Sequence, residues 1–373
     1  MNEILNSMRL TALVLLCSTQ LAACSFGYYW QATSGHWSIM RQRRPVAEVI
    51  ADPETTQTER AKLETASAAV EFAHQVLRLP DNGSYQLYAD TGRRYVVWNV
   101  VAAPEFSLQP LSWCFPVAGC VSYRGYFSED RAQDFAAGLA ANGDDIHVGG
   151  VVAYSTLGRF ADPLLNTMMV FSDDQLAGLV FHELAHQLVY ARDDSKFNEG
   201  FASFVEEEGI YRWLLSRGDQ AGLCSYGLLM QRRRQTLELF IRTREQLVAL
   251  YEQDIADELK RTAKQALFDA LNLAYDELRR SWVDPPNFDH WFDGSLNNAR
   301  LAALATYDDY VPVFSGLLRS EAGDLDAFYL RVETLASLPG DQRDSEMQAL
   351  LQSQAGSIAD PRFDDACPEG SAN

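Results

Sequence analysis

The sequence predicts an α+β fold in which a small mixed sheet precedes two helices that carry functional residues, followed by a mainly helical C-terminal region. Strands are indicated by runs of β-branched and aromatic residues between turn residues, at 85–88, 95–101 and 146–153. Helices are indicated by apolar residues at helical spacing, at 55–79 and at 129–141. Neither Gly nor Pro occurs from Leu228 to Trp282, which favours a long helix or a helical hairpin there.

The sheet is expected to lead into a helix with two histidines four residues apart. Ser172, followed by two aspartates, is typical of a helix N-cap with an acidic first turn. His182 and His186 then lie on one face of that helix, where both imidazoles can bind one metal ion. Glu183 projects beside that face, where a carboxylate can take a proton from a water activated by the metal.

A third ligand is expected from the next helix. The polar stretch 193–196 indicates a turn, after which a second helix can return antiparallel with Glu199 facing the histidines. Two histidines, one glutamate and one open position form the usual catalytic zinc site, so zinc is the predicted cofactor. The alternative interpretation is two buried core histidines whose partners are local carboxylates. Asp193, Asp194 and Glu206 are candidate partners for the histidines, with no basis for choosing among them.

These motifs resemble known metallopeptidases. The segments His182–Gln187 and Asn198–Ala202 are similar to the active-site pair of the gluzincins, a zincin-like fold, and especially to the aminopeptidase N type. The spacer between them is shorter than in that type, and no GAMEN-like segment, which holds the substrate's amino terminus there, is present. A closer resemblance is to the bacterial lipoprotein family known as putative aminopeptidases, carried also by 113–116, 119–120, 123–127, 153–158 and 162–163.

The resemblance implies a zinc peptidase with His182, His186 and Glu199 as ligands and Glu183 as the general base. Gluzincins commonly use a downstream Tyr to stabilise the oxyanion, and Tyr307 is the candidate by that resemblance. In such sites an edge strand beside the metal binds extended substrate, and residues 146–156 are the candidate. An interior strand without substrate contact is the alternative.

The first residues are interpreted as a targeting segment. Arg9 precedes a short apolar run, and Leu21-Ala22-Ala23-Cys24 resembles the lipobox of bacterial lipoproteins. This resemblance implies that residues 1–23 are removed, that Cys24 is lipidated, and that the protein is held at the outer membrane facing the periplasm. The alternative is an ordinary secretory signal with an incidental Cys. Three further divisions are expected: an α+β catalytic region at 24–215, a helical region at 216–355 and a tail at 356–373.

Composition limits the partners. The formal net charge of −20 argues against binding to nucleic acid or to an anionic lipid surface. Either partner would require a basic patch on the protein to offset its negative charge. Cys114 and Cys120 are close in sequence around turn residues and are expected to form a disulfide in an oxidising compartment. Cys224 with Cys367 is possible by elimination. His36 has no neighbour at ligand spacing and is interpreted as a surface or core residue rather than a pocket residue.

The predicted activity is zinc-dependent hydrolysis of peptides or proteins by an aminopeptidase. One alternative is an endopeptidase that acts on envelope proteins, because no amine anchor is recognised. Another is a lipoprotein that binds partner proteins through its helical region and keeps zinc only as a structural element. Glu183 argues against the last alternative, because a structural zinc site needs no base.

Overall fold

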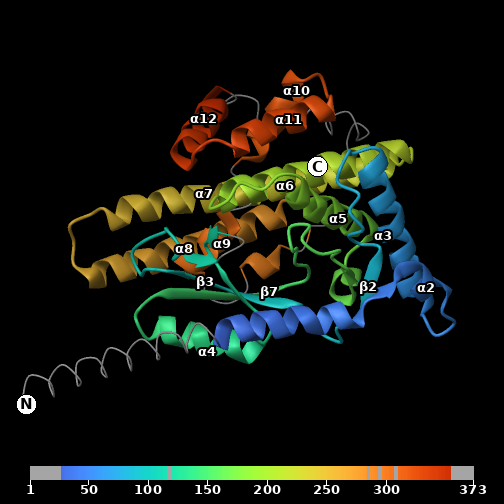
Figure 1. The fold of residues 1–373 in the computed structure, drawn as a ribbon. Coiled ribbons are helices and arrows are strands. Elements are labelled where there is room, and N and C mark those ends of the chain that lie inside the picture. Colours follow the sequence, from blue (N-terminus) through green and yellow to red (C-terminus); the bar gives the residue numbers. More distant parts are fainter. Residues whose placement is uncertain are drawn as a thin grey trace, which may run out of the picture.

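The computed structural model describes residues 27–115, 119–283, 286, 288–292, 296–305 and 310–353. Cys24, Tyr307 and Cys367 lie outside these residues, so the predictions made for them stay predictions. The described chain is an α+β structure with small sheets and mostly helical content, as the sequence predicts (Figure 1). Among the described residues, no helix has both the length and the apolar composition needed to cross a bilayer.

The elements follow in this order. The strands are β1 (Arg44–Pro45), β2 (Leu87–Ala89), β3 (Val97–Ala103), β4 (Trp113–Phe115), β5 (Gly119–Val121), β6 (Arg124–Tyr126), β7 (Asp145–Val151) and β8 (Leu164–Leu165). The helices are that of residues 27–42, α2 (Val46–Ala51), α3 (Gln57–Gln75), α4 (Glu129–Ala140), α5 (Asp173–Leu188), α6 (Ser195–Ser216), α7 (Gln220–Tyr251), α8 (Asp257–Arg280), α9 (Asn298–Ala305), α10 (Val311–Ser320), α11 (Leu325–Ala336) and α12 (Gly340–Ser353).

The strands form three separate small sheets instead of one. Strand β2 lies between antiparallel β1 and parallel β8, and this sheet is mixed. Strand β3 lies between β6 and β7 in an antiparallel sheet, and β4 and β5 form a hairpin. The strand runs were predicted close to their observed places. Their division into sheets was not predicted, because pairing depends on contacts between distant segments.

Three helices begin at side chains that cap them, and Ser172 is the cap expected from the sequence. Thr56, Ser128 and Ser172 accept hydrogen bonds from backbone N–H groups at the starts of α3, α4 and α5. These bonds satisfy N–H groups that have no partner within the helix. The Gly- and Pro-free stretch is a helical hairpin, α7 and α8, which resolves the two predicted alternatives.

The largest hydrophobic core joins both ends of the described chain. Helix α5 packs against α3 and α6, which lie beside it in Figure 1, and α6 also packs against α10. Phe197, Phe201 and Phe204 of α6 contact Phe314 of α10 through their rings. Helices α7 and α8 enclose a second core around Phe240. The fold therefore holds α6 from both sides, which fixes the helix that carries Glu199.

Candidate active site

Helix α5 presents the two histidines on a buried surface. Ser172 and Gln175 form a reciprocal capping box at its start, and its last two turns are almost fully buried. His182, Glu183 and His186 each keep no more than 9% of their surface exposed. The local sequence thus places both imidazoles and the intervening carboxylate in the interior, where unpaired polar groups are costly and must have partners or a ligand.

The turn after α5 is held by Asn198. Its side-chain oxygen accepts from Ala191 N at 2.7 Å, and its amide nitrogen donates to Ala191 O, also at 2.7 Å. Asp194 caps α6 by accepting from Phe197 N. Next to Glu199, a Cβ on Gly200 would stand 3.0 Å from Tyr310 Cβ, so the helix approaches the α10 segment closely there. The Asn-Glu-Gly sequence therefore sets the turn, supplies a carboxylate and permits this close packing.

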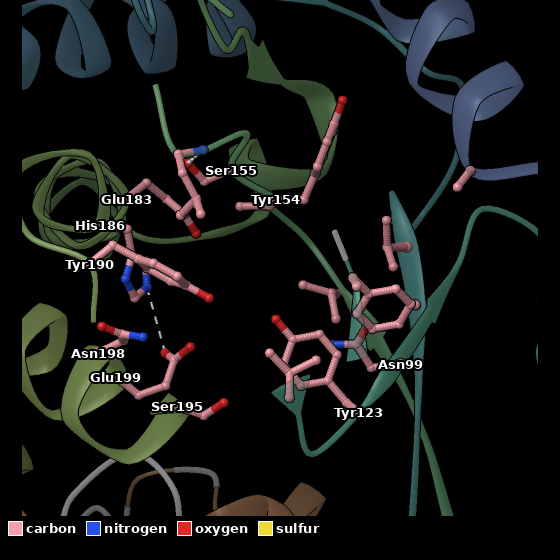
Figure 2. Close-up of a pocket in the computed structure, with 18 of the residues that line it drawn as sticks. Asn99, Tyr123, Tyr154, Ser155, Glu183, His186, Tyr190, Ser195, Asn198 and Glu199 are labelled. Atoms are coloured by element: carbon pink, nitrogen blue, oxygen red, sulfur yellow. Dashed lines mark hydrogen bonds and ion pairs between the residues drawn. The ribbon is translucent and has the colours of Figure 1, made fainter. Parts of the chain in front are cut away.

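These two helices bring three side chains to one point. His182 Nε2 lies 3.2 Å from His186 Nε2 and 3.4 Å from Glu199 Oε2, and His186 Nε2 lies 3.6 Å from the same oxygen. Figure 2 shows His186 and Glu199 turned toward one another across the cavity wall. Ligand atoms about 2.0–2.1 Å from a tetrahedral zinc stand about 3.3 Å apart. The spacing and chemistry of this donor set therefore fit a zinc ion.

One of the three candidate carboxylates contacts a histidine. Glu206, two turns further along α6, lies 3.1 Å from His182 Nδ1. Such a contact places the proton on Nδ1 and leaves the Nε2 lone pair facing the other ligands. Asp193 accepts from Cys120 N, and Asp194 pairs with Arg343, so both are used elsewhere. His186 Nδ1 is buried without a hydrogen-bond partner among the described residues.

The close contacts among these side chains shift the pKa values of His182 and Glu199. Burial alone would lower the pKa of His182, but hydrogen bonds to Glu199 and Glu206 outweigh burial and raise that pKa to about 10. Burial opposes the ionisation of Glu199, yet His186 and His182 together hold its pKa far below the usual carboxyl range. The site therefore attracts positive charge, and a divalent cation bound there would replace the proton on the ligand nitrogen.

Glu183 has a different environment. Its carboxylate faces the same space as His186 and Glu199 (Figure 2). Burial raises its pKa, with the neighbouring histidines acting in the opposite direction. No described residue makes a hydrogen bond to this carboxylate. A buried carboxylate with a raised pKa beside a cation site has the properties of a general base.

A cavity of about 430 Å³ opens in front of these residues. Its opposite wall comes from β3, β6 and the helix of residues 27–42. The hydroxyls of Tyr123 and Tyr190 point into the space before Glu199 (Figure 2). Burial, followed by the charge of Glu199, raises the pKa of both phenols, so both remain protonated donors. No Lys or Arg is found among the described residues that line the cavity.

The loop that follows β7 is organised by a buried carboxylate. Asp162 accepts from Thr156 N at 2.9 Å and from Gln187 Nε2 at 3.3 Å. Gln187 belongs to α5, so this network ties the loop to the helix that carries the histidines. Tyr154 and Ser155 of the loop line the cavity as a result.

Comparison with known proteins finds one family. A family described as "putative aminopeptidase" matches residues 27–347. The chain belongs to this family. No curated protein and no solved structure matches the chain.

The family match covers almost all of the described residues. It includes three of the four cysteines for which disulfides were predicted. Cys114 and Cys120 form a disulfide across the β4–β5 hairpin. Phe115 and Val121 of this hairpin line the cavity. Cys224 lies in α7, and its pairing with Cys367 stays a prediction.

Two further predictions concern the cavity walls. Strand β7 lies at an edge of its sheet, which is one of the two alternatives left open for residues 146–156. Asn297 covers the start of that edge by donating to Ile146 O, while Val151 lines the cavity. His36 was interpreted as a surface or core residue, but it lines the cavity and its Nδ1 lies 2.7 Å from Tyr154 Oη. The sequence carried no signal for this, because His36 reaches the site by long-range packing.

Proposed function

We propose that this protein is a zinc aminopeptidase of zincin-like architecture, with His182, His186 and Glu199 as the ligands. The observation that carries the proposal is the convergence of Nε2, Nε2 and a carboxylate oxygen at separations of 3.2, 3.4 and 3.6 Å. Three protein ligands with one open position are typical of catalytic zinc sites, and structural sites usually have four Cys or His ligands. When bound, zinc lowers the pKa of water and polarises the scissile carbonyl.

The protein's own groups divide the remaining work. Glu183 takes a proton from the attacking water and delivers it to the leaving nitrogen. Tyr123 and Tyr190 are placed to donate to the oxygen that becomes negatively charged as the carbonyl is attacked. Glu206 holds His182 in the orientation that directs Nε2 to the metal. Tyr307 remains a candidate donor by resemblance alone.

The lining of the cavity supports exopeptidase action at the amino end. Glu183 and Glu199 face the cavity, and no described lining residue is Lys or Arg. A bound zinc ion offsets the charge of these two carboxylates, so the argument rests on the lining: a substrate's C-terminal carboxylate has no Lys or Arg partner among the described residues there. The rival activity is endopeptidase cleavage of envelope proteins, because the cavity shows no dedicated amine anchor of known type.

We further propose that Cys24 carries the lipid anchor and that the enzyme faces the periplasm from the outer membrane. The lipobox-like segment before Cys24 supports this location. The disulfide in the β4–β5 hairpin is consistent with an oxidising compartment.

The deciding experiment combines metal content with a panel of free-amino and amino-blocked peptides. We expect about one zinc per chain and cleavage of free-amino peptides only. Glu183→Gln should retain zinc but lose nearly all activity, while Glu238→Gln, an exposed change on α7, should behave as wild type. Cleavage of blocked peptides would identify an endopeptidase. Zinc without hydrolysis of any peptide would favour the protein-binding role.

A further inference from the structure

The helix of residues 27–42 has two faces with different surroundings. Tyr28, Ala32 and His36 repeat every four residues and line the catalytic cavity. On the opposite face, Trp30 and Trp37 are seven residues apart and are 64% and 50% exposed. This helix runs along the lower side of the molecule in Figure 1, away from α10, α11 and α12. Two large indoles in solvent on one helix are an unusual surface for a protein that must avoid association.

The same region differs in charge from the rest of the chain. Residues 25–47 contain no Asp or Glu and three arginines, in a protein of formal net charge −20. The charge of the whole chain argues against an anionic surface as a partner. It does not describe residues 25–47, whose own charge is positive. Acidic groups lie at its borders: Glu48 follows in α2, Glu129 and Asp130 begin α4, and Arg44 is paired with Asp52.

A groove beside Trp30 adds two further cations. It has a volume of about 280 Å³ and is lined by Trp30, Ser34, Ser38, Arg93 and Arg131 among others. Arg93 donates to Phe127 O at 2.7 Å, and Arg131 donates to Gly27 O at 3.4 Å. Neither guanidinium forms an ion pair with a carboxylate of the described residues. Two guanidiniums and several hydroxyls around a groove are well suited to a phosphate group.

We propose that this face seats the protein on a phospholipid bilayer, with Trp30 and Trp37 in the headgroup layer and Arg93 and Arg131 on lipid phosphates. The inference rests on the lipid anchor at Cys24 of the proposed function. Two residues separate Cys24 from the start of the described helix at Gly27, and the three intervening steps along the chain reach about 10 Å at full extension. An anchored chain therefore holds this helix at the membrane surface, where Trp side chains are preferred.

The proposal gives the bilayer a role in the choice of substrate. Because one helix contributes both the proposed membrane face and a wall of the cavity, the catalytic cavity lies within one helix diameter of the headgroups. The net negative charge repels strongly anionic membranes, so a zwitterionic bilayer is the favoured surface. Peptides held at such a surface are then the substrates nearest to the site.

Fluorescence quenching tests the seating directly. The lipidated protein is reconstituted in vesicles of phosphatidylethanolamine and phosphatidylcholine that carry brominated acyl chains. We expect strong quenching in the wild type, and loss of most of it in Trp30→Phe/Trp37→Phe, whereas Trp282→Phe should keep it. Equal quenching in all three proteins, or none in the wild type, would overturn the proposal.

A second measurement tests the phosphate contacts without the anchor. A chain of residues 25–373, which keeps every described residue, is sedimented with the same vesicles. Arg93→Gln/Arg131→Gln should reduce binding about tenfold. Arg242→Gln/Arg331→Gln removes the same charge from exposed positions on α7 and α11 and should not. Equal binding of the two variants would exclude the groove, and a vesicle-independent dimer that depends on Trp30 would identify a second copy as the occupant.

Hydrolysis of a soluble peptide in the same preparations separates this inference from the proposed function. The surface variants should retain the wild-type rate in solution, because none of the substituted residues belongs to the zinc site. Vesicle binding without any hydrolysis would leave the membrane face standing and count against the peptidase.

Discussion

Removing the Glu206 carboxylate should weaken zinc binding without unfolding the protein. Glu206 lies 3.1 Å from His182 Nδ1, and no other described group contacts that nitrogen. In Glu206→Ala the Nδ1–H loses its acceptor at a buried position, which costs about 1–3 kcal/mol. Loss of such a partner typically reduces metal affinity about 10–100-fold, which is the same range of free energy. Because the side chain of Glu206 is 30% exposed, water can replace part of the contact, so we expect the lower end.

The assay is competition for zinc against a fluorescent chelator, with kcat/KM measured at limiting and at saturating zinc. Glu206→Gln is the matched variant, because its amide oxygen can still accept from Nδ1–H and should restore most of the affinity. Saturating zinc should recover much of the activity of Glu206→Ala, as expected for a positioning residue. A zinc Kd within about twofold of wild type in Glu206→Ala would refute the reasoning, since even a weak hydrogen bond exceeds that.

Four further outcomes are expected. Tyr123→Phe should lower kcat about 100-fold with little change in KM if its hydroxyl stabilises the oxyanion, and an unchanged kcat would transfer that role to Tyr190 or Tyr307. Burial raises the pKa of Glu183, so kcat/KM should fall as the pH drops through a value above the usual carboxyl range, and this acid limb should be absent from the residual activity of Glu183→Gln. Arg343→Met should cost about 3–5 kcal/mol of unfolding free energy in urea melts, because it leaves the buried Asp194 carboxylate without its 2.6 Å partner; a loss below about 1 kcal/mol would contradict this. Reduction of the Cys114–Cys120 disulfide should raise KM more than it lowers kcat, because the hairpin that it closes lines the cavity but carries no proton-transfer group; an unchanged KM would show that the hairpin keeps its place without the bond.

Much of the site could be predicted from the sequence because its signals are local. Ser172 caps α5, the spacing of His182 and His186 places them on one face, and the turn before Glu199 brings the next helix back. Each of these features depends on residues within about two turns of one another, for which helix geometry alone gives the distances. The candidate ligands and base therefore needed no knowledge of the remaining chain.

The tertiary structure decided which distant groups surround the candidate ligands and the base. The sequence offered Asp193, Asp194 and Glu206 as equal partners for the histidines, and packing left only Glu206 in contact. Tyr123 and His36 reach the cavity from segments at least fifty residues before α5 in the chain. No local pattern encodes such an approach, because it results from the burial of apolar faces throughout the core. The sequence by itself thus determined the chemistry of the ligand set, and the fold determined the cavity, the donors and the surface through which that chemistry can meet a substrate.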